Sequence, residues 1–254
     1  MLLKRTTRSI HLIFMVLSIL VGVKSAAAEP VTITSTNEQT YFLELYTSQG
    51  CSSCPPAEEW ISQFTDHEKL WKSIIPLNFH VDYWDYLGWK DPFASPEFSR
   101  RQRTYAKLGN SRTVATPGFI VDGKGWQGWF RGKGFPAANI KSPNTLTATI
   151  DETQVKVNFD STSDNELIAH VALLGFGIQT KVKAGENNRR LLNHDFVVIG
   201  YQQKEMIVNN KSSNVIDLPF PPVVNVDTAR TAMVVWVSTK EDPTPIQVAA
   251  DWYE

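Results

Sequence analysis

The chain has 254 residues, with 25 Lys or Arg against 26 Asp or Glu, 42% hydrophobic side chains and two cysteines. This balance argues against nucleic-acid binding, which needs clustered Lys and Arg, and against a basic membrane-binding patch. The length is typical of one large domain or two small ones.

The N-terminal residues have the order of a cleaved secretory signal. Lys4 and Arg5 precede an apolar run over residues 10–23, and small residues follow at 25–28. A run of about 14 residues is too short to span a bilayer comfortably. Cleavage after position 28 leaves 21 basic and 26 acidic side chains, a formal charge of −5. We therefore expect a periplasmic or secreted protein without stable membrane insertion; an uncleaved N-terminal anchor is the alternative.

Strand-like and helix-like segments alternate in the first half of the chain. Aromatic or apolar runs between turn residues predict strands, and apolar side chains at helical spacing predict helices. Asp122-Gly123 predicts a hairpin turn. The order is typical of an α/β layout. The predicted strands are residues 41–46, 74–81 and 114–121, and the predicted helices are residues 55–64 and 96–108.

Short strands separated by turn residues fill the second half, which predicts a small β-sandwich. A loop over residues 132–144 precedes it. The predicted strands are residues 145–150, 154–159, 167–176, 179–183, 194–202, 232–238 and 246–250. The organisation that follows is a signal peptide at 1–28, a first domain at 29–134, a linker at 135–144 and a β-rich domain at 145–254.

Cys51 and Cys54 are the candidate reactive pair. A bridge between them closes a tiny loop and stabilises the fold little, so their chemistry is the better reason for their presence. They follow a predicted strand and open a predicted helix, where unpaired N–H groups and the helix dipole favour a thiolate. We expect Cys51 to be the more exposed sulfur and the nucleophile, and Cys54 to resolve the mixed disulfide.

Thr116-Pro117 is the second candidate element. Pro117 stands at the entrance of the strand that follows the second helix, opposite the cysteines in a thioredoxin-type order. We expect a cis Thr116–Pro117 bond, with the residue before Pro117 offering backbone groups to an extended peptide. An ordinary trans proline is the alternative.

Three longer stretches carry a family resemblance: residues 44–58 (ELYTSQGCSSCPPAE), residues 80–93 (HVDYWDYLGWKDPF) and residues 185–195 (GENNRRLLNHD). Together with Thr116-Pro117, they resemble bacterial secreted thioredoxin-like proteins of unknown function. The resemblance implies export and an α/β thioredoxin-like domain, here followed by a smaller all-β, sandwich-like domain. It implies no substrate.

Several polar residues are candidates to support the cysteines. Glu44 lies in an apolar strand, where it either sits beneath the cysteines and accepts the Cys54 proton or is salt-bridged elsewhere. Asp82, Trp84 and Trp89 follow the second strand, and loops at the ends of parallel strands converge on a site. We assign them to substrate binding; the alternative is an aromatic cluster with surface acids. Four polar residues come later in the chain, and we expect them to form a capped turn; the alternative is that they face the first domain. They are Arg189, Arg190, His194 and Asp195.

The leading function is an exported thiol–disulfide oxidoreductase that acts on protein thiols, disulfides or a redox partner protein and needs no cofactor. One alternative is a copper or zinc site formed by Cys51, Cys54 and His80, because thiolates and imidazole suit these ions. The other is a non-catalytic binding module with a structural disulfide. The direction of exchange, the substrate and the oligomeric state stay open.

Overall fold

The computed structural model describes residues 29–140, 144–161, 166–209 and 213–253. The predicted signal segment lies outside these residues. No helix among them is long and apolar enough to cross a membrane.

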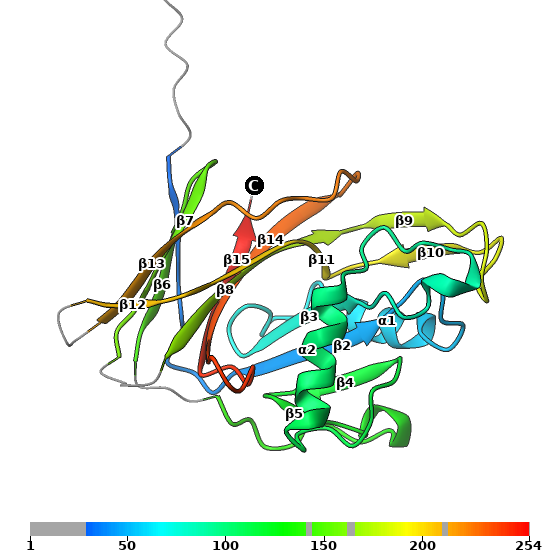
Figure 1. The fold of residues 1–254 in the computed structure, drawn as a ribbon, viewed down its shortest axis with the longest axis horizontal. Coiled ribbons are helices and arrows are strands. Elements are labelled where there is room, and N and C mark those ends of the chain that lie inside the picture. The colour runs from blue at the N-terminus through cyan, green and yellow to red at the C-terminus, as the bar shows by residue number, and fades with distance from the viewer. Residues whose placement is uncertain (1–28, 141–143, 162–165, 210–212, 254) are drawn as a thin grey trace, which may run out of the picture.

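Strands alternate with two α-helices in the first half of the described chain (Figure 1). Pro55 and Pro96 open the helices, where a missing N–H is tolerated because that donor has no intrahelical partner. Ser95 caps α2 by accepting from the backbone N–H of Glu97 at 3.2 Å. The elements are β1 (Val31–Thr34), β2 (Tyr41–Thr47), α1 (Pro55–Ser62), β3 (Ile74–His80), α2 (Pro96–Lys107), β4 (Gly118–Val121) and β5 (Lys124–Gly125).

Only strands follow in the second half of the described chain, apart from a short 3-10 turn at Trp129–Arg131 that precedes them. They are β6 (Leu146–Ile150), β7 (Gln154–Phe159), β8 (Leu167–Phe176), β9 (Ile178–Lys181), β10 (Leu191–His194), β11 (Val197–Glu205), β12 (Ile207–Asn209), β13 (Ser213–Pro219), β14 (Arg230–Thr239) and β15 (Gln247–Tyr253). One sheet has the order β1-β6-β7-β13-β12, a second has the order β15-β14-β8-β11-β3-β2-β4-β5, and β9 pairs with β10.

The expected fold class, an α/β thioredoxin-like domain followed by a smaller all-β sandwich, is wrong. Strands hold 43% of the described residues and helices 12%. Strands β8, β11, β14 and β15 continue the sheet of β2 to β5 instead of forming a sandwich of their own, and β11 joins β3 in parallel at Val197 and Asn78. The eight-stranded sheet thus takes strands from both halves of the chain.

The reason lies in the two apolar faces of the central strands. Because successive strand side chains point to opposite faces, β8 sends Ala172 and Leu174 into a core with β2, β3, α1 and α2. It sends Val171 and Leu173 into a second core with β6 and β7. Strand β14 alternates in the same way. A strand that is apolar on both faces needs both faces covered, and the large sheet provides this cover.

Glu44 belongs to the first of these cores and is held there by an ion pair. Arg101 of α2 donates to both of its carboxylate oxygens, at 2.8 and 3.1 Å, and the hydroxyls of Tyr46 and Tyr105 donate at 2.7 and 2.6 Å. Residues 44 and 47 point to opposite faces of β2, and it is Thr47 that contacts α1, through Glu58. The predicted place of Glu44 beneath the cysteines is therefore wrong, and its salt-bridged alternative is what the structure shows.

His170 of β8 is a buried histidine that predicts a pH-dependent stability. Its Nδ1 lies 2.7 Å from the Tyr201 hydroxyl, its Nε2 lies 2.9 Å from Ser238 Oγ, and its ring stacks on Trp236. Burial, together with the positive charge of Arg101 on α2, lowers the pKa of His170 well below its usual value. The native state therefore keeps this ring neutral, whereas the unfolded chain protonates it below its ordinary pKa of about 6.5.

Stability from His170 is thus present above about pH 6.5 and is lost as the pH falls below it. Lowering the pH from 7 to 5 should reduce the free energy of unfolding of both proteins. We expect the reduction to be smaller in His170→Gln than in the wild type, by up to about 2 kcal/mol. Urea unfolding at both pH values measures the difference, and the exposed His67→Gln serves as the control. Equal losses in His170→Gln and wild type would contradict the prediction.

Candidate functional site

Cys51 and Cys54 form a disulfide between the end of β2 and the start of α1. Cys54 is the N-cap of the helix, and its carbonyl accepts from the backbone N–H of Ala57 at 2.9 Å and of Glu58 at 3.2 Å. Both cysteines are 0% exposed. The position in the chain order agrees with the sequence prediction, but the expectation that Cys51 is the more exposed sulfur is wrong.

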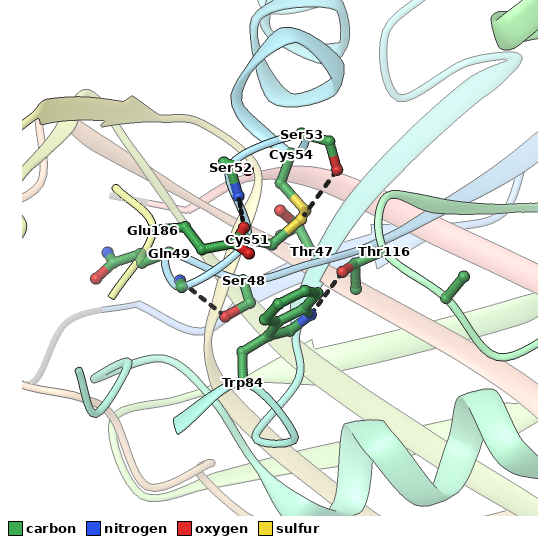
Figure 2. Close-up of a disulfide and its surroundings, with 12 residues drawn as sticks. Thr47, Ser48, Gln49, Cys51, Ser52, Ser53, Cys54, Trp84, Thr116 and Glu186 are labelled. Atoms are coloured by element: carbon green, nitrogen blue, oxygen red, sulfur yellow. Dashed lines mark hydrogen bonds between the residues drawn. A yellow bond between two sulfur atoms is a disulfide. The ribbon is translucent and has the colours of Figure 1, made fainter. Parts of the chain in front are cut away.

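The loop between β9 and β10 covers the disulfide. Asn187, fully buried, donates to the carbonyl oxygens of Cys51 at 2.8 Å and Gln49 at 3.0 Å. The Glu186 carboxylate accepts from the backbone N–H of Ser52 at 2.8 Å, and Figure 2 shows it reaching the cysteine loop from this neighbouring segment. A late part of the chain therefore closes over the early cysteine pair.

The expected cis bond between Thr116 and Pro117 is present. The indole nitrogen of Trp84 donates to Thr116 Oγ1 at 2.7 Å, and the Trp84 ring lies beside the cysteine loop (Figure 2). A Cβ at Gly50 would lie 3.0 Å from Trp84 Cβ, so the glycine is what lets Trp84 approach the cysteine loop so closely. Trp84 thus bridges the cysteine loop and the Thr116–Pro117 strand entrance.

Asp82 and Trp89 have defined partners of their own. The backbone N–H of Asp82 donates to Ser99 Oγ at 3.2 Å, and this hydroxyl donates back to the Asp82 carboxylate, which ties the end of β3 to α2. Trp89 donates its indole N–H to Gln49 Oε1 at 2.9 Å. Both side chains are partly buried. Their expected role in substrate binding stays a prediction.

His80 is fully buried at the end of β3. Its Nδ1 lies 2.8 Å from Asp91 Oδ2, and the same carboxylate accepts from the backbone N–H groups of Gln49 at 2.8 Å and Phe93 at 3.0 Å. Because an ionised carboxylate only accepts, Nδ1 of His80 carries a proton. The other ring nitrogen, Nε2, is buried and has no hydrogen-bond partner among the described residues.

His194, at the end of β10, faces α1 and is also buried. Its Nδ1 is bonded to the Glu58 carboxylate, and its Nε2 lies 3.1 Å from Gln49 Nε2. The indole N–H of Trp89 can only donate, so Gln49 presents its oxygen to Trp89 and its NH₂ group to His194. His194 Nε2 is therefore an acceptor, and the ring proton is on Nδ1, where Glu58 accepts it.

Electrostatics keeps both carboxylates of this cluster ionised. Burial would raise the pKa of Glu58, but attraction and hydrogen bonding to His194 outweigh it and hold the pKa below its usual value. Burial opposes ionisation of Asp91 too, and His80 likewise lowers the pKa of Asp91 overall. For His80, burial would lower the pKa, and Asp91 reverses this and raises it.

Three side chains of this cluster are placed to hold a metal ion. Ligand atoms of Glu58, His80 and His194 all lie within 4.8 Å of one another. The ligand set that the sequence suggests, Cys51 and Cys54 with His80, differs: the two sulfurs are bonded to each other, and His80 is grouped with Glu58 and His194.

The family model for a protein of unknown function, DUF1223, matches residues 42–238. The chain belongs to the DUF1223 family. The matched segment begins in β2 and ends in β14, so it contains the disulfide, the cover loop and the histidine cluster. No curated protein matches the chain.

Two solved structures share the fold of this DUF1223 chain. A crystal structure of a protein from Agrobacterium tumefaciens is 22% identical, with a TM-score of 0.56, and the match covers 85% of this chain and 95% of the other. HBP35 of Porphyromonas gingivalis is 13% identical, with a TM-score of 0.58, and the match covers 85% of this chain and 76% of the other. At these identities the likeness concerns the fold alone.

Several site residues of this DUF1223 chain were missed by reasoning from the sequence. They are Gln49, Glu58, Asp91, Glu186, Asn187 and the role of His194. The signal that points to them is the three long stretches behind the family resemblance, because all six residues lie in these stretches. The structure brings the three stretches together at one place, through the hydrogen bonds of Asn187, His194 and Asp91.

Proposed function

We propose that this protein is an exported thiol–disulfide oxidoreductase whose redox couple is Cys51 and Cys54. The observation that carries the proposal is a disulfide at the start of α1 between cysteines three positions apart in the sequence. Trp84 lies beside this cysteine loop and donates a hydrogen bond to Thr116, next to the cis proline. Such a short bridge stabilises a fold little, whereas its place at a helix start favours a thiolate once it is reduced.

Exchange proceeds in two balanced steps. The thiolate of reduced Cys51 attacks a disulfide of the partner protein, a new sulfur–sulfur bond forms, and one partner thiolate leaves. Cys54 then loses its proton, which the first partner thiolate takes up, and attacks Cys51 Sγ; this releases the second partner thiolate, which is protonated by solvent, and leaves the Cys51–Cys54 disulfide. Two electrons pass to the partner, whose disulfide becomes two thiols; the reverse sequence oxidises a partner dithiol.

A partner segment has a place to bind beside the proline. A hollow of about 120 Å³ is bordered by Pro117, Gly118 and Phe119, and the half-exposed Phe130 also lines it. Its volume suits a single side chain of an extended peptide. Backbone groups next to Pro117 then form main-chain hydrogen bonds with the extended partner segment, as in strand addition.

The proposal predicts a reversible couple and unequal cysteines. We expect the purified protein to cycle between disulfide and dithiol in glutathione redox buffers, and the Cys54→Ser variant to accumulate a mixed disulfide with glutathione at Cys51. Mass spectrometry of acid-quenched, alkylated samples measures both. The matched Cys51→Ser variant, which keeps only the resolving sulfur, is expected to form much less adduct.

Two results would overturn the proposal. One is a disulfide that no glutathione ratio reduces or re-forms. The other is full biological function of the Cys51→Ser/Cys54→Ser variant in cells, which would make the chain a binding module instead of an oxidoreductase.

A further inference from the structure

We propose that Glu58, His80 and His194 form a binding site for a divalent transition-metal ion of the zinc class. The site includes Glu58 of α1, four residues after Cys54, uses no sulfur ligand and is separate from the proposed exchange chemistry. Its ligand atoms lie within 4.8 Å of one another, and all three residues are at most 2% exposed.

The unpartnered nitrogen of His80 is the independent observation behind the proposal. Nε2 is buried without a hydrogen-bond partner among the described residues. A buried polar atom left in this way costs free energy, and a ligand at that point removes the cost. Asp91 holds the opposite ring nitrogen at 2.8 Å. A carboxylate that fixes one nitrogen of an imidazole while the other binds metal is the common second shell of zinc histidines.

The donor set selects the class of ion. Two imidazoles and one carboxylate suit zinc and its first-row neighbours, and three protein ligands leave a fourth position for water or another ligand. Metal–ligand bonds of about 2.0–2.1 Å place tetrahedral ligand atoms about 3.4 Å apart. The ligand atoms that are farthest apart, at up to 4.8 Å, must therefore close by up to about 1.4 Å around the ion, whereas the hydrogen-bonded atoms of Glu58 and His194 must move apart.

Charge favours a dication at this place. Glu58 and Asp91 bring two buried negative charges, and the salt-bridge partners that the described chain offers them are His194 and His80. With both histidines neutral, the cluster has a formal charge of −2. One dication balances this charge.

Metal binding also specifies a rearrangement at Gln49. His194 must turn its Nδ1 lone pair to the metal, so its proton moves to Nε2, and the Gln49 amide turns over to accept it. Trp89 then loses the Gln49 oxygen, to which it donates at 2.9 Å in this structure. Because Phe lacks the indole donor that holds the amide in its present orientation, we expect Trp89→Phe to bind the ion at least as tightly as the wild type.

Zinc binding to the oxidised protein tests the proposal. Zn²⁺ is supplied either to the folded chain or during refolding, because the site is buried, and metal is counted after dialysis by inductively coupled plasma mass spectrometry. We expect one zinc per chain in at least one arm. Glu58→Gln, which keeps the hydrogen bonds to Thr47 and His194, is expected to weaken binding at least about tenfold, and Asp91→Asn by about 10- to 100-fold.

Two controls separate this site from others. The exposed His67→Ala should keep the full stoichiometry, and so should Cys51→Ser/Cys54→Ser, which removes both sulfurs. Near-UV circular dichroism identifies any variant that fails to fold. Zinc-free protein from both arms would overturn the proposal, as would unchanged affinity in folded Glu58→Gln and Asp91→Asn. Loss of zinc in a folded double cysteine variant would show that binding needs the sulfurs and would overturn the proposal too. None of these readouts depends on thiol exchange, so the two proposals fail separately.

Discussion

Replacing Asn187 by Ala is expected to accelerate chemical reduction of the Cys51–Cys54 disulfide by on the order of 5- to 150-fold. The side chain donates to the carbonyls of Cys51 and Gln49, and both bonds must break before a reductant reaches the buried sulfurs. Each hydrogen bond contributes about 0.5–1.5 kcal/mol, so losing two raises the opened population by that factor. Timed quenching with an alkylating reagent, in excess phosphine, measures the rate.

The neighbouring Asn188→Ala is the matched control, because residue 188 is exposed and the substitution is the same. It should leave the reduction rate within about twofold of wild type, since surface changes usually have small effects. The rates are compared in buffer without denaturant, in which both variants are fully folded. Equal rates for Asn187→Ala and wild type would show that opening of this loop does not limit access to the disulfide.

Replacing Arg101 by Met is expected to lower the free energy of unfolding by about 3–5 kcal/mol. The substitution leaves Glu44 0% exposed and without its cation, although Tyr46 and Tyr105 still donate to it. Removing one partner of a buried pair costs more than removing both. The double variant Glu44→Gln/Arg101→Met should therefore recover part of the loss. Urea denaturation followed by two probes gives the three values.

Arg100→Met is the control for this prediction, because Arg100 lies next to Arg101 on α2 but is exposed. We expect it to change the unfolding free energy by less than about 0.5 kcal/mol. A loss below about 1 kcal/mol for Arg101→Met would mean that Glu44 finds other compensation, and the pair would then not be a main support of this core.

Local patterns predicted most of the elements well. The strand at residues 41–46 and the helix at residues 96–108 match β2 and α2 to within a residue or two. Errors arose where the backbone leaves the regular pattern. The strand predicted at 194–202 corresponds to β11 and contains only the last residue of β10, because Phe196 has a φ of 58° and turns the chain between the two strands. Strands β1, β12 and β13 were not predicted; they are short or rich in polar residues.

For the candidate site too, local features were predicted correctly and a long-range contact was not. The cysteines and the cis Thr116–Pro117 bond were found from spacing and order along the chain. Glu44 was placed on the wrong side of β2. The sequence of an apolar strand with a single acid does not reveal which of its faces packs against α2, the helix that carries the ion-pair partner. That partner, Arg101, is 57 residues away.

The sequence by itself determined that two cysteines stand between a strand and a helix start, with a proline at a later strand entrance. Those features are local. Turn residues, helix-opening prolines and apolar runs fix the ends of the strands and the start of the helix to within a few residues. Only the tertiary structure decided that the disulfide is covered by the loop of Asn187 and that Glu58, His80 and His194 lie together. The hydrogen bonds of Asn187 and His194 in these contacts join residues 136 to 145 positions apart. They depend on strands of both halves sharing one sheet, a pairing set by covering two apolar faces and not by any single segment.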